Sequence, residues 1–304
     1  MKQLRIGFII TLLTASLMGG LMMGHVQSAH ARSRSITVVS SLDVYAEAAQ
    51  AVLGHAGTAT AIINSPSIDA EDYEPTTATA KQVAKADVVI ANGVGYDDWL
   101  TRVATANNKQ RQTITVGDQL LSRKAGDNPH VWYHKKTMPL VVKQLVSRFS
   151  RLQPQRKRQF QQNATRYLAT LTPWHQLTQQ IRKTSQNQRV AVSEPVANDM
   201  LTAAGLKVTN DHFARSVEEG TDPSPADIAK LTADFKHHRV VMWVENTQNS
   251  QTIVDNMTKT ARRYHVPVVK VTETLPRGKT YAQWMTAELT QVQAALKEAK
   301  EDDR

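Results

Sequence analysis

Three side chains that can bind a metal ion follow predicted β-strands or lie in a loop beyond one. Glu194 ends the apolar run Arg189–Ser193, Glu273 ends the run Pro267–Thr272, and His130 follows a proline in a loop. Open α/β sheets bind their ligands beyond the carboxyl ends of the strands. Carboxylate and imidazole groups gathered there are typical ligands of divalent metals, although each could instead cap a helix or form a salt bridge. The three residues therefore indicate a metal site.

The elements that must position these residues alternate between strands and helices. Apolar runs predict strands in the first half over Ser35–Ser40, Thr60–Asn64, Asp87–Asn92 and Thr113–Val116. Helical spacing lies between them over Val44–Leu53, Thr77–Lys85 and Tyr96–Ala104. Strands that alternate with helices predict a parallel sheet covered on both faces.

The second half repeats this alternation. Strands are predicted over Arg189–Ser193, Leu206–Thr209, Val240–Val244 and Val266–Thr272. Helices are predicted over Pro195–Ala204, Ser224–Phe235, Ser250–Tyr264 and Tyr281–Ala299. The intervening stretch Asn210–Phe213 reads as a loop, and its His212 is a minor candidate for contact with the site.

A helical region separates the two halves. Thr137–Leu152 has apolar residues at helical spacing, and a second helix starts near Gln155 and can run to about Lys183. Pro173 lies inside that pattern, so we expect a kink or a break there. Such a helix of roughly 28 residues would span ~40 Å. We predict an α/β fold with two (βα)4-type lobes, each with a parallel sheet, joined by a long rigid backbone helix, and a metal cleft between the lobes.

The N-terminus has the features of an export signal. Lys2 and Arg5 precede the apolar stretch Ile6–Met23, and small residues up to Ala31 end in an Ala-x-Ala cleavage pattern. An uncleaved membrane anchor is the alternative, because the stretch is near the ~18-residue lower limit for a span. We predict an export signal over 1–31, an N-terminal lobe over 32–136, a helical linker over 137–185 and a C-terminal lobe over 186–304.

The chain contains no cysteine. An exported protein without cysteine forms no disulfides, so its core alone must hold the fold. It also has no thiolate for metal binding and no cysteine for a lipid anchor. We therefore expect an exported protein at the cell surface, in the cell wall or in the periplasm, without a lipid anchor.

Positive charge is concentrated in one segment. The net charge is +10, and no acidic residue lies between Asp127 and Glu194. That segment holds twelve cationic residues: Lys135, Lys136, Lys143, Arg148, Arg151, Arg156, Lys157, Arg158, Arg166, Arg182, Lys183 and Arg189. Such a segment is either a solvated helical face or a binding surface for anionic cell-wall polymers or lipid head groups. No nucleic-acid recognition motif accompanies it.

Several blocks of sequence resemble one protein family. They are Asp69-Ala-Glu-Asp-Tyr-Glu-Pro75, Asn128-Pro-His-Val-Trp-Tyr133, Ser193-Glu-Pro195 and Val271-Thr-Glu-Thr274. In order and spacing they resemble the manganese- and zinc-binding solute-binding components of bacterial ABC importers, over essentially all of residues 35–300. The resemblance implies two lobes that hold one ion, with two ligands from each lobe.

The resemblance assigns the ligands residue by residue. His130, Glu194 and Glu273 match three of them, and Glu71 stands where the family motif Asp-Pro-His-x-Tyr-Glu-Pro has a histidine. A second departure is His134, where the family usually has aspartate. Glutamate can still bind an ion, and a shell of one imidazole and three carboxylates favours Mn²⁺, with Zn²⁺ next. The alternative is a site that has lost its ion.

These observations lead to three functional hypotheses. The first is a monomeric capture protein that carries Mn²⁺ or Zn²⁺ to an ABC permease in the membrane. The second is a metal-dependent hydrolase, which needs an open coordination position and a general base. The chain has no Ser-His-Asp order, no His-Glu-x-x-His and no glycine-rich phosphate loop, so we expect no enzyme. The third is a surface protein that binds or adheres to cell-wall polyanions through its basic segment.

Overall fold

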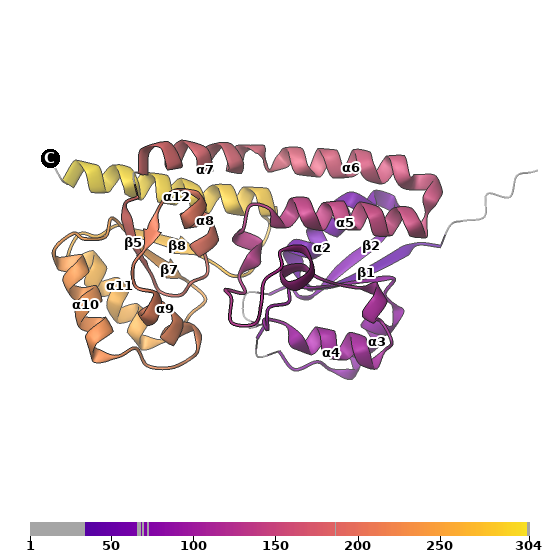
Figure 1. Ribbon diagram of the computed structural model, residues 1–304, viewed down its shortest axis with the longest axis horizontal. Coiled ribbons are helices and arrows are strands. Elements are labelled where there is room, and N and C mark those ends of the chain that lie inside the picture. Colours follow the sequence, from indigo (N-terminus) through magenta and orange to yellow (C-terminus); the bar gives the residue numbers. More distant parts are fainter. Residues whose placement is uncertain (1–33, 66–67, 69, 72, 186, 303–304) are drawn as a thin grey trace, which may run out of the picture. The chain divides into compact units, whose positions relative to one another are not determined.

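The structure is a computed structural model that describes residues 34–65, 68, 70–71, 73–185 and 187–302 (Figure 1). The predicted export signal lies outside these residues and stays a prediction. From Ser35 onward the described chain forms one compact unit. No helix among the described residues is long and apolar enough to cross a membrane.

The first half of the chain builds a parallel four-stranded sheet. Its strands are β1 (Ile36–Leu42), β2 (Gly57–Ile63), β3 (Val88–Ala91) and β4 (Thr113–Thr115), in the order β2-β1-β3-β4. The connecting helices are α2 (Asp43–Leu53), α3 (Thr77–Lys85) and α4 (Asp98–Ala106). Shorter helical turns are η1 (Gly54–Ala56), η2 (Gln110–Gln112), η3 (Val116–Leu120) and η4 (Val131–Tyr133). All of the strands predicted here are present, with small shifts at their ends.

The second half builds a second parallel sheet with the same kind of order. Its strands are β5 (Arg189–Val192), β6 (Lys207–Val208), β7 (Trp243–Asn246) and β8 (Val268–Val271), in the order β6-β5-β7-β8. Its helices are α8 (Asn198–Ala203), α9 (Asp211–Glu218), α10 (Pro225–Lys236), α11 (Thr252–Arg263) and α12 (Tyr281–Asp302). Two parallel four-stranded sheets with helices confirm the predicted α/β class. The boundaries predicted for the lobes stay predictions.

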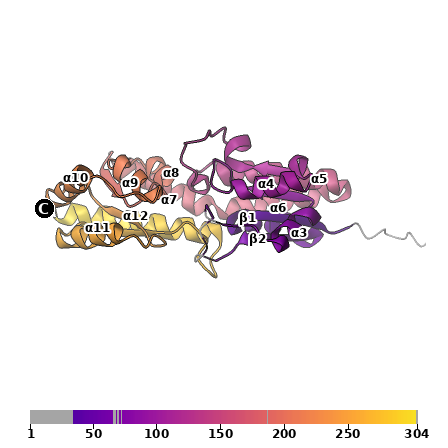
Figure 2. The same ribbon diagram turned by 90° about the horizontal axis from the view of Figure 1, so that it is seen from below.

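The helical region between the sheets consists of several helices. They are α5 (Thr137–Leu152), the turn η5 (Pro154–Arg156), α6 (Lys157–Thr170) and α7 (Thr172–Ser185). The helical region breaks at Leu171, between α6 and α7, close to the position predicted from Pro173. Proline has no N–H to donate to the carbonyl of Ala169, so one continuous helix cannot form there without losing a hydrogen bond. Pro173 therefore lies in the first turn of α7, where the N–H groups need no partner in the helix. Helix α6 packs against α2 and α5, and α7 packs against α8 and α12 (Figure 1 and Figure 2).

The stretch Asn210–Phe213 was predicted to be a loop, and this prediction is wrong. Helix α9 begins there, at Asp211. The helix forms because Phe213, Ala214 and Val217 recur at helical spacing and are all buried. Its short length and its charged ends concealed it in the sequence. This correction matters for the site, because the last residue of α9 is Glu218.

Buried contacts join the segments around the two sheets. One hydrophobic core contains residues of both, such as Val39 of β1 and Val192 of β5. The carboxylate of Glu47 on α2 accepts a hydrogen bond of 2.7 Å from the backbone N–H of Tyr281 at the start of α12. Burial raises the pKa of Glu47 to about 7. These contacts fix the chain just after β8, which carries one of the predicted metal ligands.

Candidate metal centre

His130 is held in a buried position at the start of η4. Its side chain is 3% exposed, and its ring meets the rings of Tyr96 and Trp132 edge-on, with centroids 5.8 and 5.3 Å away. Its backbone N–H donates a hydrogen bond of 2.9 Å to Oδ1 of Asn128. The ring is therefore fixed by packing and by the backbone, as a metal ligand has to be.

His130 and Glu273 come together from distant parts of the sequence. Nε2 of His130 lies 3.7 Å from Oε2 of Glu273. Two ligand atoms that each lie about 2.1 Å from one ion at a tetrahedral angle are about 3.4 Å apart. The separation in the structure therefore fits a single shared ion within a few tenths of an ångström.

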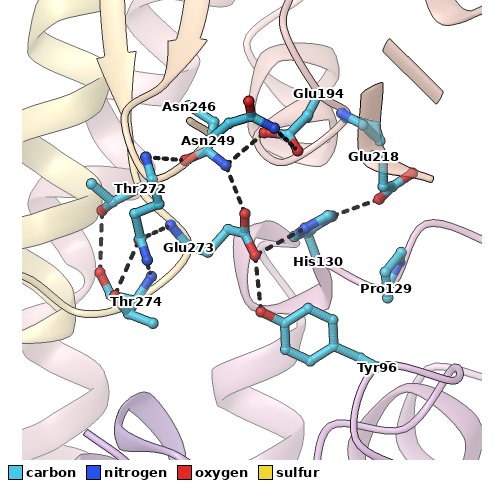
Figure 3. Close-up of polar contacts among 12 residues, drawn as sticks. Tyr96, Pro129, His130, Glu194, Glu218, Asn246, Asn249, Thr272, Glu273 and Thr274 are labelled. Atoms are coloured by element: carbon cyan, nitrogen blue, oxygen red, sulfur yellow. Dashed lines mark hydrogen bonds and ion pairs between the residues drawn. The ribbon is translucent and has the colours of Figure 1, made fainter. Parts of the chain in front are cut away.

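Asn246, the last residue of β7, links the two predicted glutamate ligands. Its side-chain amide donates 2.7 Å to Oε2 of Glu194 and 2.6 Å to Oε1 of Glu273 (Figure 3). Asn249 donates a further hydrogen bond of 2.9 Å to Oε1 of Glu194, and Tyr96 donates 3.0 Å to Oε2 of Glu273. The carboxylates at the ends of β5 and β8 therefore face one common region.

The electrostatics of the cluster favour charge on Glu273. Burial alone would raise the pKa of Glu273, but the hydrogen bond and charge of His130, with the donors Tyr96 and Asn246, hold it below its ordinary value. Burial alone would lower the pKa of His130, but the hydrogen bond and charge of Glu273, with the charges of Glu218 and Glu71, raise it. Burial raises the pKa of Glu194. A bound cation could take over from the proton of His130 as the positive partner of Glu273, and it would favour the ionised form of Glu194.

Glu71, His134 and His212, the other residues discussed from the sequence, differ from these three in burial and partners. Glu71 is exposed, and its charge contributes to the raised pKa of His130. His134 is half-buried, and burial together with the charges of Arg123 and Lys136 lowers its pKa. His212 does not enter the site, because its Nδ1 lies 2.6 Å from Oδ2 of Asp227 and its side chain is 77% exposed.

No three histidine, aspartate or glutamate side chains among the described residues are grouped closely enough to hold an ion as they stand. The amide of Asn246 explains this spacing, since it donates to both glutamates and lies between them. The assignment of Glu71, His130, Glu194 and Glu273 as metal ligands therefore stays a prediction.

Sequence reasoning missed four residues of this cluster. They are Tyr96, Glu218, Asn246 and Asn249, each of which contacts at least one of the predicted ligands. Asn246 could have been found, because it ends an apolar strand in the same way as the two glutamates. The others follow from long-range contacts that no local pattern encodes.

Two cavities are lined by residues that contact His130. One, of about 320 Å³, is lined by Glu194, Glu273 and Asn246 among others. The other, of about 270 Å³, is lined by Asn128 and Glu218 among others. The first of these cavities holds the carboxylates of both predicted glutamate ligands, whereas the second is also lined by Arg215.

Comparisons with known proteins show what the chain as a whole is similar to. The metal ABC transporter substrate-binding lipoprotein SloC of Streptococcus mutans is 23% identical over 230 residues, which cover 70% of this chain and 74% of that protein. The manganese-binding lipoprotein MntA of Halalkalibacterium halodurans is 24% identical over 221 residues, which cover 70% of this chain and 72% of that protein.

Solved structures show the same fold. The Mn-bound periplasmic metal binding protein of Candidatus Liberibacter asiaticus has a TM-score of 0.70 at 18% identity, over 86% of this chain and all of that chain (100%). The periplasmic zinc binding protein TroA of Treponema pallidum has a TM-score of 0.72 at 16% identity, over 86% of this chain and 99% of that chain. The family model for the periplasmic component A of the zinc-uptake complex (ZnuA) matches residues 38–295, and the chain therefore belongs to that family.

Proposed function

We propose that the protein captures one divalent transition-metal ion outside the cytoplasm and delivers it to an ABC permease. The ion would be held by His130, Glu194 and Glu273, with Glu71 as the fourth ligand. The observation that carries this proposal is the 3.7 Å separation of His130 Nε2 and Glu273 Oε2, within a cluster that also presents Glu194. Membership of a family of metal-transport components supports it.

The donor set favours Mn²⁺. One imidazole and several carboxylates form an oxygen-rich shell, which suits a hard ion. Zn²⁺ has the higher intrinsic affinity for most nitrogen and oxygen sites, so it is the closest competitor. Relatives named for manganese and for zinc are consistent with both ions.

The ion would enter by replacing the hydrogen bonds that Asn246 donates to the two glutamates. Those bonds hold both carboxylates close to the position they need, which lowers the conformational entropy lost on binding. Glu71, exposed and close enough to influence His130, would complete the shell from the first half of the chain.

Calorimetric titration with Mn²⁺ and Zn²⁺, after chelation, tests the proposal. We expect one ion per protein, with binding lost in Glu194→Ala and kept in Glu298→Ala, whose glutamate is exposed on α12. The loss follows because Glu194 supplies one of the few anionic ligands. If neither ion binds the unaltered protein, the capture function is wrong.

The family supports transport over the alternative of a metal-dependent hydrolase. A separate observation favours a second role at the cell surface. Ten of the twelve cationic residues of the basic segment are exposed, all except Arg148 and Arg156. Nine of the ten lie on or next to helices α5, α6 and α7, and Arg189 begins strand β5. Among the described residues, only Arg189 of the twelve lies within 4.0 Å of a carboxylate.

We therefore propose that this surface binds an anionic cell-wall polymer. Binding to purified polymer should weaken steeply as salt rises, because exposed charges are screened. At a fixed salt concentration, replacing Lys157 and Arg158 by glutamine should weaken polymer binding without changing the affinity for the metal ion. Polymer binding that is insensitive to salt would contradict this second role.

A further inference from the structure

Glu218 occupies a half-buried position beside Nδ1 of His130. Its Oε1 lies 3.5 Å from Nδ1 of His130, and its side chain is 20% exposed. That oxygen is buried and has no hydrogen-bond partner among the described residues. A buried carboxylate oxygen without a hydrogen bond is costly, so its position needs an explanation.

The hydrogen bonds around Asn128 determine which nitrogen of His130 carries the proton. Oδ1 of Asn128 accepts the backbone N–H of His130 at 2.9 Å, and Nδ2 donates to the carbonyl of Pro195 at 2.6 Å. Both ends of the amide are thereby assigned. Oδ1 also lies 2.8 Å from Nδ1 of His130, and since it can only accept, Nδ1 must carry a proton.

A protonated Nδ1 leaves the Nε2 of a neutral His130 with a lone pair that faces Glu273. The ion therefore belongs on the Nε2 side of the ring, and Glu218 lies on the Nδ1 side (Figure 3). Glu218 therefore faces the ring nitrogen opposite the ion and is not placed to bind that ion directly. Its charge acts on the ion through the imidazole.

We propose that Glu218 is a positioning residue of the metal centre. Asn128 accepts the Nδ1–H of His130, and the negative charge of Glu218, 3.5 Å from Nδ1, stabilises that tautomer, in which Nε2 faces the ion. This inference rests on the proposed metal-capture function. A carboxylate behind a histidine ligand fixes the tautomer and raises the basicity of the ring, and its loss typically costs 10–100-fold in metal affinity.

The test compares Glu218→Gln with Glu219→Gln. Glu219 is the next residue, is exposed and lines the same cavity. We expect Glu218→Gln to weaken Mn²⁺ and Zn²⁺ binding by about 10–100-fold, and Glu219→Gln to leave it unchanged. The melting temperature of the ion-free protein should stay the same in both variants. Glu218→Ala provides a second variant that removes the carboxylate altogether.

Nitrogen-15 NMR of the histidine rings gives a second readout. In the Zn²⁺-loaded protein, His130 should show a protonated Nδ1 and a metal-bound Nε2, and Glu218→Gln should shift the Nδ1 signal. Unchanged affinity in Glu218→Gln would overturn the inference and leave the capture function intact. Complete loss of binding would also overturn it, because Glu218 would then be a ligand. If the unaltered protein binds neither ion, the capture function itself fails.

Discussion

Replacing Glu273 by glutamine is expected to lower the affinity for Mn²⁺ and Zn²⁺ by more than about 100-fold. Losing a partner of a ligand already costs 10–100-fold, and Glu273 would be a ligand that carries charge. Glu273 also contacts three other residues of the cluster, since it faces His130 and accepts hydrogen bonds from Tyr96 and Asn246. Glutamine keeps the size of the side chain and removes its charge. Calorimetric titration measures the change.

Glu298→Gln is the matched control, because it removes one exposed carboxylate from the same half of the chain. It should bind both ions as the unaltered protein does. A melting curve of ion-free Glu273→Gln separates lost ligation from lost folding. If the folded variant retains affinity within 10-fold, Glu273 is not a ligand and the ion must lie elsewhere.

The sequence predicted the strand-end residues well, for a physical reason. Parallel strands end at the same edge of their sheet, so acids that follow β5 and β8 must lie near each other. Neighbouring pairs β5–β7 and β7–β8 place the ends of those strands on both sides of Asn246. Hydrophobic period and turn residues are enough to locate such strands.

The residues around these ligands could not be predicted in this way. Tyr96 reaches Glu273 across 177 positions of sequence, and no local pattern encodes such a contact. Glu218 was hidden because α9 is a helix of only 8 residues, too short for its period to stand out. Asn246 was overlooked because an amide is a weak candidate for metal binding, whereas its role here is to donate to two acids.

The second large effect is expected from Glu288, a buried acid on α12. It is 4% exposed and accepts hydrogen bonds from Nε1 of Trp284 at 2.6 Å and from the backbone N–H of Thr272 at 3.0 Å. The hydroxyl of Tyr133 lies 2.7 Å from both Oε2 of Glu288 and the carbonyl of Thr272. Glu288 therefore ties the chain that follows His130 to the chain that precedes Glu273.

Replacing Glu288 by alanine is expected to lower the free energy of unfolding by about 3–5 kcal/mol. The indole N–H of Trp284 and the N–H of Thr272 would lose their acceptor, and each buried unsatisfied group costs about 1–3 kcal/mol. The cavity left by the side chain adds to the loss. Urea denaturation measures it, with Glu298→Ala as the control on the same helix. A loss below about 1 kcal/mol would contradict this role.

The effect should depend on pH, because burial raises the pKa of Glu288 to about 7 from its ordinary 4.5. The geometry agrees, because the hydroxyl of Tyr133 has two oxygen neighbours and only one proton. If it donates that proton to the carbonyl of Thr272, its contact with Oε2 of Glu288 is a hydrogen bond only when Glu288 is protonated and donates. Because the folded state binds this proton more tightly than the unfolded state, stability falls as pH rises from 4.5 through 7.

A glutamine at position 288 carries no titrating proton, so Glu288→Gln isolates this contribution. Between about pH 8 and about pH 5, the unaltered protein should gain up to about 3 kcal/mol of unfolding free energy relative to Glu288→Gln. Denaturation curves of both proteins across that range measure the difference. Parallel pH profiles would mean that Glu288 is ionised in the folded protein, and the hydrogen-bond arrangement at Tyr133 would then have the opposite sense. Because Tyr133 and Thr272 flank the proposed ligands, metal affinity should weaken together with stability in Glu288→Ala.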